Sequence, residues 1–114
     1  MARKTHLYLL WTNDNLITAE KMVFMYAINS LTQGWWGKVT LIAWGATIKL
    51  IRENADIQKK VKEAQDAGVH VSACKACANQ LGVTETLEKL NIEIKYWGKP
   101  LTEILTSDEK LLTI

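Results

Sequence analysis

Two cysteines, Cys74 and Cys77, are the residues of this chain best suited to covalent chemistry. They lie in the segment 67–82, AGVHVSACKACANQLG, where an apolar run gives way to a polar, helix-like one. The alternation over residues 69–73 predicts a strand and the residues from Lys75 onward predict a helix, so Cys74 ends a strand and precedes a helix. Backbone N–H groups at the start of a helix and the charge of Lys75 both favour the reactive thiolate of Cys74.

The second thiol, Cys77, follows about one helical turn later, a spacing that suits a disulfide or a resolving thiol. We expect Cys77 to lie within the first turn of the helix and to point inward. Cys74 is then the more reactive cysteine and Cys77 the secondary thiol of the site.

Several other chemistries fit these residues poorly. A structural zinc site needs about four ligands, and the chain has a single C-x-x-C pair and two histidines, His6 and His70. Both histidines alternate with strand residues, as structural histidines do. The segment CKACANQ has no arginine for a phosphatase or rhodanese loop, and the first loop, WTNDN, is not glycine-rich as a flavin or dinucleotide site would be. We therefore expect no metal and no organic cofactor.

Length and composition bound the protein class. The chain has 114 residues, 48% of them hydrophobic and 23% charged, which is typical of one soluble globular domain spanning residues 1–114. The net charge of +2 is dispersed, so we expect no nucleic-acid partner. The apolar run in the first eleven residues, MARKTHLYLLW, is shorter than a signal core or a membrane span. We expect a cytoplasmic protein without a membrane partner. In that reducing compartment a C-x-x-C pair is more often metal-binding or redox-active than a permanent disulfide.

The rest of the chain alternates strand and helix patterns. Strict alternation gives an open, mostly parallel five-stranded sheet covered on both faces, a three-layer α/β/α domain. The expected strands are His6–Trp11, 39–43, 69–74, 92–97 and 111–114, and the expected helices are 15–32, 46–51, 56–67, one from Lys75, 84–90 capped by Thr84, and one from Pro100.

The first four strands end on large or reactive residues. Ligands of such sheets bind outside the carboxyl ends of the strands, so these residues should meet at one edge. In one interpretation they form an aromatic-walled pocket, and in the other the tryptophans roof the core or fill a subunit interface. The pocket would consist of Cys74 with Trp11, Asn13, Asp14, Trp44, Gly45, Lys75 and Trp97, whereas Trp35 and Trp36 lie at the opposite edge and are expected in an interface.

The first helix carries an unusual apolar run, MVFMYAI, at residues 22–28. Seven successive apolar residues place apolar side chains on every side of a helix, more than one buried face can cover. We expect a closed homo-oligomer with this helix at or near the interface.

Four segments carry a resemblance to a known family. They are Trp44-Gly45, ENADIQKKVKEAQDAGV, VSACKACANQLGV and the ending KYWGKPLTEILTSDEKLLTI. Through them almost the whole chain resembles the DsrE/DsrF-like proteins, which include the sulfur-relay subunits TusD and DsrE. The resemblance implies a DsrEFH-like fold, a persulfide carried on Cys74, assembly into trimers or hexamers, and sulfur donor and acceptor proteins as partners.

Two functions remain open from the sequence. In the first, the protein is a sulfur carrier or sulfurtransferase whose Cys74 thiolate accepts and passes on sulfane sulfur. In the second, it is a non-catalytic, oligomeric protein that binds a small ligand in the tryptophan-lined pocket or senses redox state through its cysteines.

Overall fold

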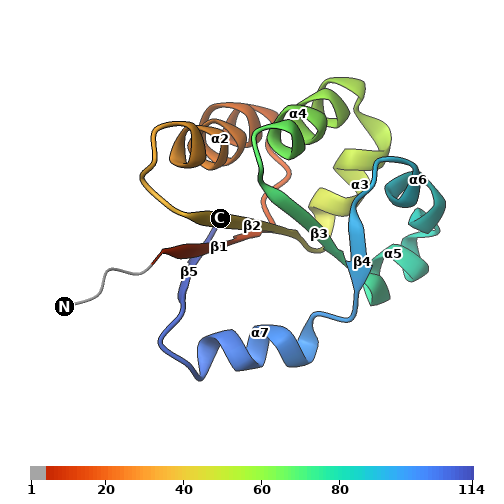
Figure 1. The fold of residues 1–114 in the computed structure, drawn as a ribbon. Coiled ribbons are helices and arrows are strands. Elements are labelled where there is room, and N and C mark those ends of the chain that lie inside the picture. The colour runs from red at the N-terminus through yellow and green to blue at the C-terminus, as the bar shows by residue number, and fades with distance from the viewer. Residues whose placement is uncertain (1–4) are drawn as a thin grey trace.

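Five parallel strands form the centre of residues 5–114, the part of the chain that the computed structural model describes (Figure 1). Their order across the sheet is β4-β3-β2-β1-β5, and helices lie on both faces, so the predicted α/β fold class is confirmed. The basic start of the chain, residues 1–4, lies outside the described residues. The strands are β1 (His6–Trp11), β2 (Lys38–Ala43), β3 (His70–Cys74), β4 (Glu93–Lys95) and β5 (Lys110–Thr113).

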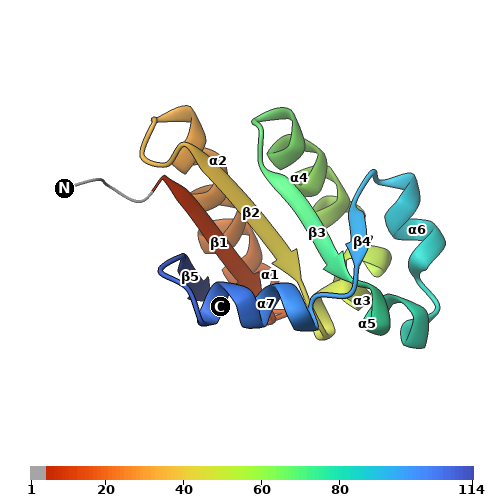
Figure 2. The ribbon, with the colours of Figure 1, turned by 60° about the horizontal axis from the view of Figure 1, so that its bottom comes forward.

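The helices divide unequally between the two faces. Parallel crossovers are right-handed, and β1 to β4 step across the sheet in one direction, which places their connecting helices on the same side. The connection from β4 returns past β1 to the far edge, so its helix lies on the opposite face, where Figure 2 shows α7 crossing the sheet alone. The helices are α1 (Leu16–Thr18), α2 (Met25–Thr32), α3 (Ala46–Glu53), α4 (Ala55–Asp66), α5 (Lys75–Leu81), α6 (Thr84–Lys89) and α7 (Gly98–Leu105).

The two sheet faces differ in chemistry. Leu9 and Leu41 are fully buried in the main core under α2 and α4. Alternate positions along β1 are only half-buried because they face the side that α7 covers in part. There Ile42 packs with Trp97 and Ile104 in a second, smaller apolar cluster.

The first helical segment is continuous but changes its winding. Between α1 and α2 lies a π-helical segment, η1 (Ala19–Phe24). Phe24 is fully buried, whereas Met25 is 48% exposed and Ile17 is 71% exposed. Within the apolar run Met25 therefore reaches solvent, whereas Phe24 belongs to the core rather than to an outer face.

A few local predictions are wrong. Thr84 does not cap its helix, because Val83 holds the cap position and the Thr84 hydroxyl donates to Asn79 Oδ1 at 2.9 Å. Strand β4 stops at Lys95, and Trp97 begins the α7 turn instead of ending a strand. None of the helices within residues 5–114 has the length and apolar character needed to cross a membrane.

Candidate functional site

The two cysteines lie where β3 passes into α5. Cys74 is the last residue of β3, in register with Lys95 of β4, and it is also the cap residue of α5. Both thiols are free. The expected exposures are reversed: Cys74 is 4% exposed, whereas Cys77 is half-buried. Strand pairing holds Cys74 inside the sheet, while the first turn of α5 carries Cys77 outward.

Cys77 is surrounded by three groups from the predicted site. Burial raises the pKa of the Cys77 thiol, a hydrogen bond from the Gly45 backbone N–H lowers it, and the adjacent Cys74 thiol raises it again. A hydrogen bond from the Trp44 indole also lowers it, but the net pKa is raised. The structure thus brings Cys74, Cys77, Trp44 and Gly45 together. When Cys77 loses its proton, the Gly45 N–H and the Trp44 indole can stabilise the resulting thiolate.

Gly45 has a backbone conformation that shapes this cluster. Its φ of +73° and ψ of −128° are open almost only to glycine. A Cβ added at Gly45 would meet no atom within 4 Å, so open space adjoins the loop that donates to Cys77.

The three tryptophans do not form one pocket wall, which corrects the sequence-based expectation. Trp11 is fully buried in the main core, edge-on to Phe24 at 5.2 Å between ring centroids. Trp97 is buried on the other face of the sheet, and only the half-buried Trp44 packs against both clusters. Trp11 occupies one of the alternate positions of β1 whose side chains face the main core, as Leu7 and Leu9 do. Trp97 follows the end of β4, so the alternation of that strand does not set its direction.

Three other predicted residues have exposed side chains whose contacts, where there are any, are with groups other than the thiols and the thiols' hydrogen-bond partners. Asn13 and Asp14 are exposed, and the backbone N–H of Asn13 donates to the Ile114 carbonyl at 3.2 Å, on the β5 side of β1. Lys75 is exposed and places its Nζ 5.4 Å from the centre of the Tyr96 ring. At the opposite edge, Trp35 is 54% exposed.

A polar groove that the sequence analysis missed lies on the α7 face. It has a volume of about 710 Å³ and lies between the first residues of β1, β2 and β3, strand β4, and the segment that contains α7. Its size is within the range of small-molecule sites. The strands contribute His6, Tyr8, Lys38, Thr40, His70, Glu93 and Lys95, and the segment after β4 contributes Trp97, Pro100, Glu103, Ile104, Ser107 and Glu109.

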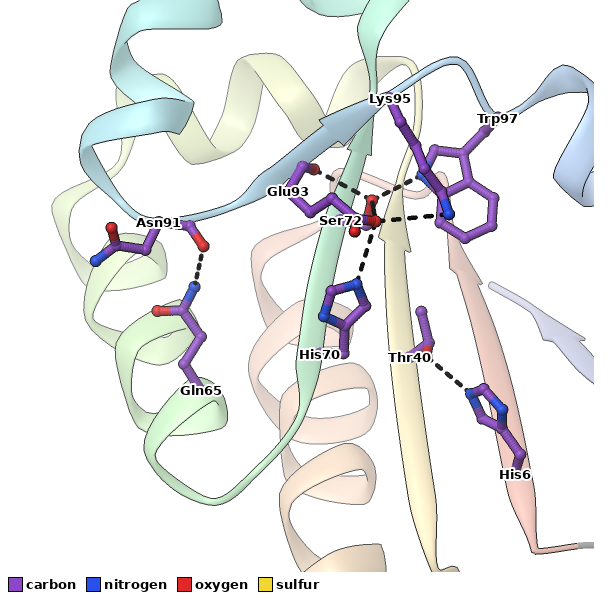
Figure 3. Close-up of polar contacts among 9 residues, drawn as sticks. All are labelled: His6, Thr40, Gln65, His70, Ser72, Asn91, Glu93, Lys95 and Trp97. Atoms are coloured by element: carbon purple, nitrogen blue, oxygen red, sulfur yellow. Dashed lines mark hydrogen bonds and ion pairs between the residues drawn. The ribbon is translucent and has the colours of Figure 1, made fainter.

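A hydrogen-bond chain crosses one wall of this groove (Figure 3). The Trp97 indole donates to Ser72 Oγ at 2.8 Å, and Ser72 lies 2.9 Å from Glu93 Oε1. His70 Nε2 and Lys95 Nζ reach the same carboxylate oxygen at 3.1 Å and 3.7 Å. Burial alone would raise the pKa of Glu93, but hydrogen bonds from His70 and Ser72 and the charges of His70 and Lys95 lower it overall.

The groove leaves a signal in the sequence. Polar residues alternate in three strands that pair in register, with Thr40 opposite His70 and Ser72 opposite Glu93. His6 extends the pattern, since its Nε2 lies 2.8 Å from Thr40 Oγ1. Among the residues that the structure describes, no three His, Cys, Asp or Glu side chains are grouped so that they could hold a metal ion.

Comparison with solved structures places this fold among proteins of unknown function. The conserved protein BT1422 from Bacteroides thetaiotaomicron is 39% identical, with a TM-score of 0.94, and the alignment covers 96% of this chain and 95% of that one. The fold is shared with MTH1491 from Methanobacterium thermoautotrophicum (12% identity, TM-score 0.79, 97% and 100% covered) and with the ychN protein from E. coli (17%, 0.73, 96% and 99%). No protein-family model and no curated protein matches the chain.

Gly45→Ala should destabilise the protein by about 1–3 kcal/mol, because alanine is strained at this φ and ψ although its Cβ has room. Any relaxation of the loop also moves the N–H that lowers the Cys77 pKa, so Cys77 should be alkylated more slowly at a given pH. Urea unfolding and iodoacetamide kinetics measure the two effects. Gly98→Ala is the matched control, since it also has open space but no positive φ. If Gly45→Ala and Gly98→Ala had equal effects, the positive φ of Gly45 would not be the cause of the loss of stability or of the slower alkylation.

Glu93→Gln should flatten the acid side of the stability profile. Because the folded-state pKa of Glu93 is lowered, its stabilisation is present above the unfolded-state value and is lost as the pH falls through the folded-state value. Thermal unfolding from about pH 7 to about pH 3 should therefore show a smaller loss in Glu93→Gln than in the wild type. Glu85→Gln, which removes an exposed carboxylate paired with Lys89, should retain the wild-type slope.

Proposed function

The chain belongs to the same family as the conserved Bacteroides thetaiotaomicron protein, whose function is unknown, and we propose from its own residues that it is a sulfur carrier holding sulfane sulfur as a persulfide on Cys74. The observation that carries the proposal is the paired thiol site: Cys74 at the carboxyl end of β3, with Cys77 beside it. The resemblance of this segment to the DsrE/DsrF-like sulfur-relay proteins favours the same role.

The burial of Cys74 supports a carrier that must protect its cargo. A persulfide exposed to bulk thiols is stripped by exchange. Cys74 lies within the sheet and Cys77 lies outside it, so a small thiol has to pass Cys77 and the Gly45 loop to reach the sulfane sulfur. Slow stripping would give the protein time to meet its acceptor.

The loading step needs no metal or organic cofactor. The Cys74 thiolate attacks the outer sulfur of a donor persulfide, a new sulfur–sulfur bond forms on Cys74, and the donor leaves as a thiolate. Atoms and charge balance, because the persulfide hydrogen travels with the transferred sulfur. An acceptor thiolate removes the sulfur by the same exchange.

The polar groove under α7 favours a second candidate, a protein that binds a small ligand without catalysis. The groove is large enough for a small molecule and offers Lys38 and Lys95 on its sheet wall and Glu103 on its α7 wall. In this version the cysteines act as a redox sensor. The groove replaces the tryptophan-walled pocket expected from the sequence as the ligand site.

The free thiols and the exposed apolar side chains bear on where the protein works and how it assembles. Free thiols suit a reducing compartment, so we place the protein in the cytoplasm, with sulfur donor and acceptor proteins as its partners. The exposed Ile17 and Met25 on the first helical segment, together with the family resemblance, support a homo-oligomer, a trimer or a hexamer.

Incubation with a cysteine desulfurase and sulfur-labelled cysteine should load label on the wild type and on Cys77→Ser but not on Cys74→Ser. Cys74→Ser lacks the sulfur atom on which the persulfide would form, whereas Cys77→Ser retains it. Intact mass without reductant and label retained after gel filtration are the measurements, and a known acceptor protein in parallel verifies the donor.

Label on Cys74→Ser but not on Cys77→Ser would assign the carrier role to Cys77. Absence of label on both the wild type and Cys77→Ser, with the known acceptor loaded, would reject the carrier and favour the ligand-binding alternative.

Met25→Glu should dissociate the homo-oligomer without unfolding the chain, because a charge at this exposed position is harmless in a monomer but unpaired in an interface. Sedimentation at low micromolar concentration measures the assembly, and circular dichroism verifies the fold. Leu105→Glu, at an exposed position on α7, is the control and should leave the assembly intact. A wild-type protein that sediments as a monomer would reject the oligomer. Phe24→Glu is unsuitable here, since it would place a charge in the core.

A further inference from the structure

The two thiols are placed so that they can react with each other. Cys74 caps α5 and Cys77 is the third residue of that helix, a spacing of about 5 Å between Cα atoms by helical geometry. A disulfide accepts Cα separations of about 4.4–6.8 Å. The Cys74 thiol is also near enough to raise the pKa of the Cys77 thiol. The two cysteines are therefore close enough for a disulfide within one turn of the chain.

We propose that Cys77 resolves the persulfide on Cys74, so that the protein releases its sulfur as hydrogen sulfide and closes an internal disulfide. This inference rests on the proposed carrier function and adds an activity to it. The sulfur of a loaded chain then has two fates: transfer to an acceptor thiol, or release as sulfide.

The step balances within the protein. The Cys77 thiolate attacks Cys74 Sγ, the inner sulfur of the persulfide, and the bond from Sγ to the outer sulfur breaks. The outer sulfur leaves as HS⁻ with the bonding electron pair and its own hydrogen. Sulfane sulfur is reduced to sulfide while the two cysteines are oxidised to a disulfide. A cellular dithiol reductant, acting by thiol–disulfide exchange, restores both thiols for another cycle.

The surroundings of Cys77 fit an attacking thiol. Burial raises the pKa of the Cys77 thiol, while hydrogen bonds from the Gly45 N–H and the Trp44 indole act in the opposite direction and stabilise the thiolate once it forms. Because Cys77 is only half-buried, a reductant can reach the finished disulfide through the Cys77 sulfur. Cys74 is 4% exposed, so thiols in solution reach a persulfide on Cys74 less readily than the Cys77 thiol of the same chain does.

The test is a single-turnover release assay. Chains loaded by the desulfurase are freed of small molecules by gel filtration and incubated without reductant, and sulfide is measured with intact mass over time. The wild type should release one sulfide per loaded chain and lose two hydrogens relative to the reduced protein. Cys77→Ser should keep the added sulfur and release none. Ala76→Ser, which adds a hydroxyl in the same turn without removing a sulfur, should behave as the wild type.

The outcomes separate the two proposals. A loaded wild type that keeps its added sulfur without releasing sulfide overturns the resolving role and leaves the carrier function standing. Equal release from Cys77→Ser overturns it as well. Failure of both the wild type and Cys77→Ser to load rejects the carrier function, and the resolving role with it. Release that accelerates with pH in the wild type supports a thiolate attack, because the raised pKa leaves Cys77 mostly protonated at neutral pH.

Discussion

The handedness of the parallel crossovers is the constraint on which the rest of the structure depends. The three crossovers from β1 to β4 run in one direction, so their helices, from α1 to α6, lie on one face and build the main core there. The single return crossover leaves α7 as the cover of the other face. One helix cannot cover five strands, so that face stays partly open. The right-handedness of the crossovers thus places the main apolar core on one face of the sheet and the polar groove on the other.

The thiol site shows how a strand end can bury one sulfur and present another. Cys74 belongs to two elements at once, since its backbone pairs with β4 and also begins α5. Its side chain is therefore held by the sheet. Cys77 belongs only to the helix, which turns its sulfur toward Gly45 and Trp44 from the neighbouring strand end. Two chemically identical groups, three residues apart, therefore differ in burial.

The sequence predicts most of the fold because its signals are local. Alternation and glycine breaks locate the strands, and they place Cys74 at the end of β3 correctly. The direction of a side chain is harder, because it depends on the phase of the strand and on where the strand stops. Trp11 keeps the phase of Leu9 and enters the core, whereas Trp97 lies past β4 and follows the α7 turn. Polar alternation in β2, β3 and β4 marks the sheet wall of the groove, but the opening itself depends on how little of the sheet α7 covers, which the local pattern does not encode.

The pairing of β5 with β1 also imposes an order on assembly during synthesis. Strands β1 to β4 pair with neighbours that have already emerged from the ribosome, whereas the outer edge of β1 must wait for the last residues of the sheet. The Ile114 carbonyl then accepts hydrogen bonds from the backbone N–H groups of Thr12 and Asn13 at 2.7 Å and 3.2 Å, which fastens the first loop. A nascent chain can therefore form its thiol turn before it has an α7 groove. The edge of β1 is an open template for pairing with other chains until β5 arrives.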